Sequence, residues 1–262
     1  MQSDVPDVPK AMLTEERRRW IVAALEREGK VVACELSRVL EVSEDTIRRD
    51  LRELAAEGRV QRVHGGALPA PRVSANYAVR ATQSTSTKIT LARAAATLVR
   101  PSSVVLVDGG TTNVEIMRHL APDLHATVVT NSPPVAVALA DHPHIEVIVL
   151  GGRMFKSSRA TIDAITLEGV RSVRADLCFL GVCSVHPDTG VSTLDFSEAH
   201  IKRAMVASSA EVVAVALGEK LGTAAPYVVA PLSELTQLVT EASVSDEALA
   251  PYYAAGVTVL RA

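Results

Sequence analysis

Residues 31–67, VVACELSRVLEVSEDTIRRDLRELAAEGRVQRVHGGA, predict two short helices, a tight turn and a hairpin. The second helix begins after Ser43, whose hydroxyl is well suited to an N-cap. Its apolar residues Ile47, Leu51 and Leu54 recur at helical spacing and form one buried stripe. The pattern therefore predicts a small module in which two helices pack through one face each.

The opposite face of the second helix carries side chains that can read DNA. At about 100° per residue, Arg49 and Arg52 fall opposite the apolar stripe, and Thr46 and Arg48 flank it. Long donors suit phosphates and guanine edges, and short polar groups allow close approach in a major groove. We therefore predict a recognition helix here.

A two-stranded wing follows this helix in the sequence. Residues 59–63 alternate like a strand, and a glycine-containing tip follows. Such a wing would bring Arg62 and His64 close to the DNA backbone or the minor groove. A solvated helix face is the alternative, because residues 44–66 hold five basic and five acidic side chains and their net charge gives no support for DNA binding.

The first predicted helix begins at Thr14 and ends at Gly29. Three consecutive arginines, Arg17, Arg18 and Arg19, lie in its first turns. They are candidates for phosphate contacts, and a solvated helix start is the alternative.

The composition favours an α/β protein. The chain has 262 residues, of which 48% are hydrophobic and only 3% aromatic, so its core consists of Ala, Val and Leu. Such a core is typical of Val-rich parallel strands, and the length allows one or two domains. The net charge of −3 excludes a global attraction to nucleic acid or to an anionic membrane.

The cysteines and the apolar runs indicate a cytoplasmic protein. Cys34, Cys178 and Cys183 form neither a disulfide framework nor a zinc spacing, so we expect no metal and no cofactor. Cys178 and Cys183 are predicted to be buried small apolar residues. No apolar run approaches the ~20 residues that span a bilayer, and the acidic N-terminus is unlike a signal peptide. We expect no membrane partner.

The C-terminal two thirds of the chain alternate between apolar runs and helical patterns. The predicted strands are residues 103–107, 127–129, 145–150, 177–181, 211–217, 235–239 and 257–260. The predicted helices are residues 88–99, 113–120, 133–141, 198–210 and 246–254, with Ser132, Ser197 and Ser245 as N-caps. This alternation predicts parallel strands with helices on both faces of the sheet.

Four predicted loops at strand ends carry groups that suit a ligand. They are residues 108–112 (DGGTT), 130–132 (TNS), 151–153 (GGR) and 218–222 (GEKLG). Glycines let the backbone approach an anion, a helix start offers free N–H groups, and threonines add hydroxyls. The first loop lacks the Gly-Lys-Ser/Thr ending of a Walker A motif.

Parallel strands would bring these four loops to one edge of the sheet. Arg153, Lys220, the Asp108 carboxylate and several N–H or hydroxyl donors would then line one cleft. Each loop alone is an ordinary turn, so the prediction rests on their convergence. A small phosphorylated, hydroxyl-rich molecule suits such a cleft.

The wording VSEDTIRRDLREL, followed by GRVQRVHGGA, resembles the DeoR-type winged helix-turn-helix, a family of bacterial sugar-catabolism repressors. The resemblance covers residues 14–67. It implies that the helix after Ser43 is the recognition helix. The implied DNA contacts are Ser43, Thr46, Arg48 and Arg49, with His64 on the wing.

The motifs DGGTT, TNS, LGGR, DLCFLGV, EAHIKRAM and GEKLG resemble the C-terminal effector domain of the same family, over residues 86–238. That domain is similar in fold to ribose-5-phosphate isomerase and CoA transferases, and its effectors are phosphorylated sugars or related metabolites. The implied effector-binding residues are Asp108, Gly110, Thr111, Thr112, Thr130, Asn131, Gly152, Glu198 and Lys220. Asp108 and Glu198 would hold hydroxyls and Lys220 the phosphate, whereas a surface ion pair between Glu198 and Lys202 is the alternative.

Two places depart from the family pattern. In SSRATIDAITLEG, Asp163 stands near a position where the family often has glycine, and Ser184 also replaces a frequent glycine. The shape of the pocket, and therefore the identity of the ligand, is expected to differ here.

The sequence thus predicts four segments and one function. The segments are a disordered tail (1–13), a winged helix-turn-helix DNA-binding domain (14–67), a linker with a short helix (68–85) and an α/β effector-binding and oligomerisation domain (86–262). We expect a DNA-binding repressor of a sugar or carbohydrate catabolism operon. A dimer or tetramer would place recognition helices on repeated half-sites of double-stranded operator DNA, and a phosphorylated sugar would change their spacing.

Two other functions fit parts of the sequence. An isomerase-like enzyme would use Asp108, Glu198 and Lys220 for proton transfer on a sugar phosphate, but such an enzyme has no use for a DNA-reading domain. A DNA-binding protein whose C-terminal domain only oligomerises is the other alternative. It predicts that no small molecule changes DNA binding.

Overall fold

The computed structural model describes residues 12–71 and 76–262 of the chain. Most of the predicted tail and four residues of the predicted linker lie outside the described residues. The chain divides into two compact units, one up to Ala70 and one from Pro71 onward, with residues 222–224 grouped with the first unit.

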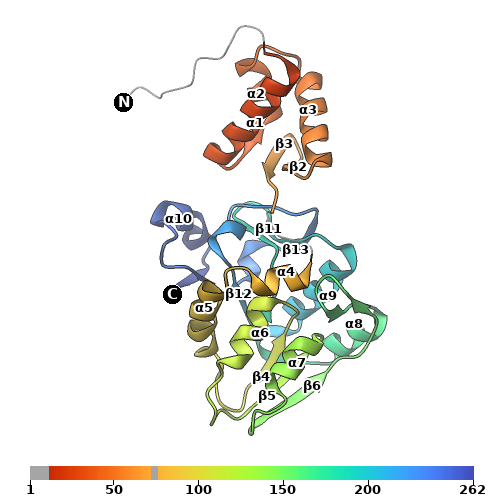
Figure 1. Ribbon diagram of the computed structural model, residues 1–262, viewed down its shortest axis with the longest axis vertical. Helices are drawn as coiled ribbons and strands as arrows, with labels where there is room; N and C mark the ends of the chain where they lie inside the picture. The colour runs from red at the N-terminus through yellow and green to blue at the C-terminus, as the bar shows by residue number, and fades with distance from the viewer. Residues whose placement is uncertain (1–11, 72–75) are drawn as a thin grey trace. The chain divides into compact units, whose positions relative to one another are not determined.

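The N-terminal unit is the predicted winged helix-turn-helix (Figure 1). Its elements are α1 (Thr14–Glu28), β1 (Val31–Val32), α2 (Ala33–Val39), α3 (Glu44–Ala56), β2 (Val60–Val63) and β3 (Gly66–Pro69). The three strands form an antiparallel sheet in the order β1-β3-β2, so the wing has one strand more than the sequence predicted. Ile21 and Leu25 of α1, Leu36 of α2, and Ile47 and Leu54 of α3 are buried and join the three helices in one core.

The C-terminal unit is built on a seven-stranded parallel sheet with the order β15-β14-β12-β9-β4-β5-β6. The strands are β4 (Val104–Val107), β5 (Ala126–Thr130), β6 (Ile145–Val149), β9 (Ala175–Leu180), β12 (Ser209–Val215), β14 (Gln237–Thr240) and β15 (Thr258–Arg261). Each predicted strand corresponds to one of these, and their parallel pairing is confirmed.

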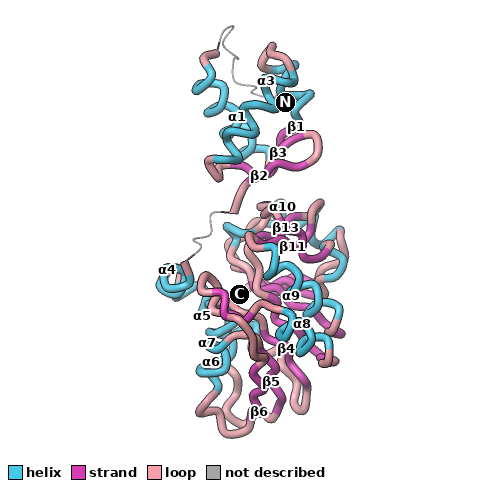
Figure 2. The backbone as a smooth tube through the Cα atoms, turned by 90° about the vertical axis from the view of Figure 1, so that its right-hand side faces the viewer, coloured by secondary structure: helices cyan, strands magenta, loops and turns pink. Residues whose placement is uncertain are grey.

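Helices cover both faces of the sheet (Figure 2). The helices on one face are α5 (Thr85–Ala96), α6 (Thr111–Arg118) and α7 (Pro133–Leu139), and those on the other are α8 (Ala164–Arg171), α9 (Phe196–Ala207) and α10 (Asp246–Ala254). Inward residues alternate along each strand: Leu177 and Phe179 pack on the first face, and Cys178 and Leu180 on the second. This period of two is what a sheet buried on both sides requires.

Shorter elements complete the unit. They are the helix α4 (Tyr77–Thr82), the hairpin of β7 (Met154–Phe155) and β8 (Ala160–Thr161), the antiparallel sheet of β10 (Ser184–His186), β11 (Gly190–Thr193) and β13 (Tyr227–Ala230), and the 3₁₀ turns η1 (Gly218–Lys220) and η2 (Leu232–Glu234). Within the described chain, no helix is long and apolar enough to cross a membrane.

One predicted N-cap is wrong, and one helix was not predicted. The N-cap of α9 is Asp195, whose carboxylate accepts from Glu198 N at 2.9 Å, and Ser197 lies inside the helix. The sequence did not predict α8, which begins after Asp163. The carboxylate of Asp163 accepts from Thr166 N at 3.0 Å, so Asp163 is the N-cap of this helix.

The order of the strands leaves an opening at one place. From β4 the chain adds β5 and β6 on one side of the sheet, and then returns to add β9, β12, β14 and β15 on the other. The connections after β4 and β9 therefore diverge to opposite faces. Ligands of open α/β sheets bind in the crevice at such a switch point, beyond the carboxyl ends of the strands.

Candidate functional site

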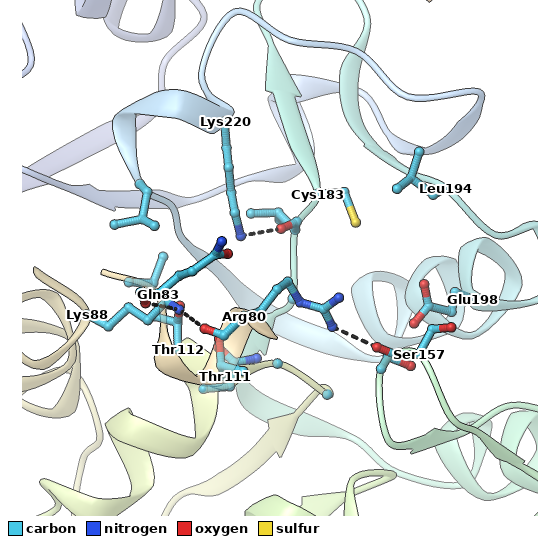
Figure 3. Close-up of a pocket in the computed structure, with 18 of the residues that line it drawn as sticks. Arg80, Gln83, Lys88, Thr111, Thr112, Ser157, Cys183, Leu194, Glu198 and Lys220 are labelled. Carbon is cyan, nitrogen blue, oxygen red and sulfur yellow. Dashed lines mark hydrogen bonds between the residues drawn. The ribbon is translucent and has the colours of Figure 1, made fainter. Parts of the chain in front are cut away.

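A cavity of about 270 Å³ lies at this switch point. Its lining residues come from the turns after β4 and β9, from α4 and α5, from the start of α9 and from η1 (Figure 3). All these elements belong to the C-terminal unit. The cavity therefore collects side chains from segments more than 100 residues apart in the sequence.

The N-terminus of α6 forms one wall of the cavity. Gly110 is the N-cap and offers no side-chain acceptor, and Thr111 and Thr112 line the cavity in the first turn. Helix geometry leaves the first N–H groups without partners in the helix, and the macrodipole makes this end positive. A Cβ on Gly109 would lie 2.8 Å from Ala160 Cβ, so only glycine fits this turn. This wall can bind an anion.

Besides Lys202, the cationic side chains Arg80, Lys88 and Lys220 line the same cavity (Figure 3). Lys88 Nζ donates to Arg80 O and to Gln83 O, the latter at 2.7 Å. Arg80 Nη2 donates to Ser157 O at 2.9 Å, and Lys220 Nζ donates to Val182 O at 2.8 Å. The cations thus converge while each donates to a backbone carbonyl.

Burial makes two of these cations easier to deprotonate. Desolvation lowers the pKa of Lys88, and the charge of Arg80 lowers it further. Desolvation also lowers the pKa of Lys220, and both Arg80 and Lys88 add to the decrease, while Cys183 acts in the opposite direction. A bound anion would relieve this repulsion.

Lys202, which lines the cavity, forms a buried ion pair with Asp108. Lys202 Nζ donates to Asp108 Oδ2 and to Gly181 O, and Asp108 also accepts from Gly109 N at 2.7 Å and from Gly181 N at 3.0 Å. Burial lowers the pKa of Lys202, but the charges of Asp108 and Glu198 outweigh it and the pKa is raised overall. The Asp108 carboxylate is therefore engaged by the protein's own groups and holds β4 against β9.

Glu198 lies at the other end of the cavity from Lys88 (Figure 3). Its Oε2 accepts from Thr193 Oγ1 at 3.2 Å. The surface ion pair with Lys202 that the sequence left open is therefore wrong, because Lys202 is buried and bound to Asp108. A carboxylate at this end can accept from the hydroxyls of a ligand whose anionic group lies at α6.

The structure brings some of the predicted effector-binding residues to the cavity and leaves others outside. Those that line it are Gly110, Thr111, Thr112, Glu198 and Lys220, and those that do not are Asp108, Thr130, Asn131, Gly152 and Arg153. Thr130 Oγ1 donates to Val107 O at 2.6 Å, and Asn131 Nδ2 donates to Thr161 O at 3.1 Å, so both hold the ends of strands together. Gly152 and Arg153 are exposed.

Several lining residues have no counterpart in the sequence-based prediction. They are Arg80, Gln83, Lys88, Ser157, Cys183 and Lys202. A signal was present for Lys88, because it shares the buried stripe of α5 with Leu91 and Ala95 at helical spacing. A lysine on such a stripe indicates a buried charge that has a structural or binding role. Cys183, predicted to be buried, is half-exposed and lines the cavity, whereas Cys178 is fully buried as expected.

The outward face of α3 is a second candidate site. Ser43 caps the helix by accepting from Thr46 N at 3.2 Å. Arg49 and Arg52 are exposed, and no ion pair of either is found within the described residues, whereas Arg48 pairs with Glu44 at 2.7 Å. On the wing, the predicted contacts Arg62 and His64 are also exposed. This surface offers donors to an anionic partner.

Two arginines of α1 have a different role from either one predicted. Arg17 Nε lies 2.5 Å and Arg18 Nε 3.2 Å from the carboxylate of Asp50, which is only 1% exposed. Arg18 also reaches Glu53 on α3 at 2.6 Å. Neither arginine is a phosphate contact or a solvated helix start, because both fix α3 on α1.

Two family models match the chain. The DeoR-like helix-turn-helix domain matches residues 17–70, and the DeoR C terminal sensor domain matches residues 83–242. The HTH-type transcriptional regulator GlpR of Haloferax volcanii is 34% identical over 252 residues, which are 95% of this chain and 98% of that protein. The glycerol-3-phosphate regulon repressor of Escherichia coli is 30% identical over 87% of this chain and 90% of its own length.

Solved structures show more distant likeness. A probable sor operon regulator from Shigella flexneri aligns with a TM-score of 0.45 and 11% identity, over 64% of this chain and 89% of its own. Ribose 5-phosphate isomerase A from Methanocaldococcus jannaschii aligns with a TM-score of 0.38 and 15% identity, over 52% of this chain and 54% of its own.

Proposed function

The chain belongs to the DeoR family of helix-turn-helix transcriptional regulators, and from this we propose that it represses a sugar or carbohydrate catabolism operon under the control of a phosphorylated metabolite. As a member of this family it is a DNA-binding regulator and not an enzyme. Two relatives carry the names HTH-type transcriptional repressor GlcR and glycerol-3-phosphate regulon repressor. These names support a carbohydrate catabolism operon as the target.

One observation carries the choice of ligand. The N-terminus of α6 and three cations, Arg80, Lys88 and Lys220, meet at one cavity, and Glu198 lies at its other end. A phosphate group would accept from the α6 backbone and from the cations, and sugar hydroxyls would donate to Glu198. Drug-sized ligands need roughly 300–1,000 Å³. A cavity of about 270 Å³ therefore favours a small sugar phosphate.

The DNA surface would be α3 and the wing. In this proposal α3 enters the major groove, where Arg49 and Arg52 reach bases or phosphates and Ser43 and Thr46 allow close approach. Arg48 can exchange its partner Glu44 for a phosphate. The wing residues with the same role are Arg62 and His64.

The regulator would act as a homo-oligomer in the cytoplasm. A helix-turn-helix protein that reads repeated half-sites needs at least two copies. The effector would favour one spacing of the DNA-binding units over another, since a ligand shifts a conformational equilibrium only by binding its states unequally.

Calorimetric titration of the full-length protein tests the ligand class. We expect sugar phosphates to bind and the same sugars without phosphate not to bind. Lys220→Gln should weaken binding by roughly tenfold or more, because a hydrogen bond to a charged group contributes about 1.5–3 kcal/mol. The matched control is Arg93→Gln, since Arg93 is exposed on α5 and does not line the cavity. Equal affinity for sugars with and without phosphate would reject the proposal.

A further inference from the structure

The short helix α4 is held in place by side chains that also line the cavity. It has only six residues, Tyr77–Thr82, and comes directly after the segment that joins the two units in the sequence. Helices shorter than about 12 residues are marginal in water on their own. Its N-cap Asn76 accepts from Ala78 N at 2.9 Å, which satisfies one backbone donor. Whether α4 stays helical therefore depends on its contacts with the rest of the C-terminal unit.

Two of these contacts are made by cavity cations. At the C-terminal end of α4, Lys88 Nζ donates to Arg80 O and Gln83 O, and Lys88 is only 6% exposed. From α4 itself, Arg80 Nη2 donates to Ser157 O at 2.9 Å (Figure 3). A third contact is separate from the cavity: the Arg159 guanidinium lies 4.6 Å from the ring centre of Tyr77, which is buried.

A phosphate group would compete for the first two contacts. Lys88 and Arg80 line the cavity together with Thr111, which belongs to the first turn of α6. A phosphate oxygen carries charge, so its contact with an ammonium or guanidinium is an ion pair and gains a coulombic attraction that a neutral carbonyl lacks. Lys88 already uses two of its three ammonium N–H groups on Arg80 O and Gln83 O, so turning the ammonium toward a phosphate bends those two hydrogen bonds. An anion at α6 therefore draws the two cations away from the carbonyls of Arg80, Gln83 and Ser157.

We infer that α4 is the element of the C-terminal unit that responds to the occupancy of the cavity. A phosphate bound at α6 takes Lys88 and Arg80 from the backbone carbonyls, and α4 loosens. Lys88 is the positioning residue of this device, because it alone bridges the cavity and two carbonyls at the end of α4 within the described residues. The inference rests on the proposed phosphate site.

Amide hydrogen exchange of the full-length protein, followed by mass spectrometry, measures phosphate binding at α6 and the loosening of α4 in one experiment. The probe is inorganic phosphate, compared with chloride at equal ionic strength. Phosphate at α6 should slow exchange in peptides that contain residues 110–113, because their N–H groups become hydrogen-bonded. Peptides that contain residues 77–83 should exchange about tenfold faster, the change expected for the loss of a charged hydrogen bond.

Matched variants separate this role from simple stabilisation. In Lys88→Gln, α4 should exchange rapidly without phosphate, and phosphate should not accelerate it further. Arg93→Gln removes a cation from the exposed side of the same helix and should behave as the wild type. Unchanged exchange in β12 of both variants shows that the sheet is intact.

The outcomes distinguish this inference from the function on which it rests. Protection at residues 110–113 with unchanged or slower exchange of α4 would overturn the role of α4 and leave the phosphate site standing. No protection at residues 110–113 would overturn both. Protection there, together with phosphate-dependent acceleration of α4 that Lys88→Gln abolishes, is the expected result.

Discussion

Single cationic side chains give the two functional surfaces their different chemistry. On α3, Arg49 and Arg52 are exposed to solvent. In the cavity, Lys88 and Lys220 are desolvated and lie close to Arg80. Exposed arginines suit a large anionic surface such as DNA, since Arg donates in a planar fork. Crowded, desolvated lysines suit one small anion that neutralises them.

The role of Arg49 can be tested by truncation. Arg49→Ala should weaken operator binding by about 1–3 kcal/mol if Arg49 reads a base edge, and should leave the binding of sugar phosphate unchanged. Fluorescence anisotropy on operator and on scrambled DNA measures the effect, with Arg93→Ala as the control. An equal loss on both DNAs would show that Arg49 contacts only phosphates.

The lowered pKa values of Lys88 and Lys220 predict a pH dependence of ligand binding. As the pH rises through these pKa values, the ammonium groups lose their protons and the phosphate dianion loses its partners. Affinity should therefore fall at a pH below the ~10.4 of an ordinary lysine. Calorimetry between about pH 7.5 and pH 10, where phosphate is already dianionic, measures this. Lys220→Gln should show a shallower fall, and affinity that stays constant to pH 10 would contradict the account.

At the scale of elements, α3 is positioned by a buried charge as well as by its apolar stripe. Asp50 lies on α3 between Ile47 and Leu51, and its carboxylate binds Arg17 and Arg18 of α1. Breaking a buried ion pair is costly because one charge is left without a partner. The orientation of α3, the proposed recognition helix, therefore depends on a residue outside its exposed face.

Asp50→Asn tests this dependence. It should lower the free energy of unfolding of the N-terminal unit by about 3 kcal/mol, since Arg17 keeps its charge but loses its ionic partner in a buried place. The matched control is Asp45→Asn, the same chemical change on the same helix at an exposed side chain, which should change stability by less than about 0.5 kcal/mol. Urea unfolding measures both. Similar small effects would show that the apolar stripe alone positions α3.

The elements that follow from local pattern were predictable, and those that depend on distant pairing were not. The seven strands of the parallel sheet are continuous Val-rich runs, and their spacing by helices indicates parallel order. By contrast, β11 pairs with β13, whose residues lie more than 30 positions later, and both are four residues long. The equally short β4 was predictable because its four residues, VVLV, are all apolar, whereas β11 is GVST.

The candidate site shows the same division. Gly110, Thr111 and Thr112 could be found because a strand-to-helix turn carries its own signature. Arg80 and Lys88 precede the first strand of the sheet, and their place in the cavity depends on how α4 and α5 fold back over the strand ends. Asp108 has the right composition for a ligand contact, but Lys202, 94 residues away, binds its carboxylate. In each case the contact joins residues that are distant in the sequence and close together in the fold.

At the scale of the whole molecule, the account requires more than one copy of the chain. Analytical ultracentrifugation should give the mass of two or four chains, and operator DNA should bind with two recognition helices per pair of half-sites, about 10.5 base pairs or a multiple apart. Insertion of five base pairs between the half-sites should abolish tight binding. A monomer that binds a single half-site with full affinity would contradict this arrangement.

The central claim is that one chain couples a DNA-reading surface to a phosphate-binding cavity. The most direct test is fluorescence anisotropy of the protein on the DNA upstream of its own gene, against scrambled DNA, with a panel of sugar phosphates added. We expect tight, sequence-selective binding that one sugar phosphate shifts and that the corresponding sugar without phosphate does not. Selective binding that no phosphate changes would contradict the coupling and leave the C-terminal unit with oligomerisation alone.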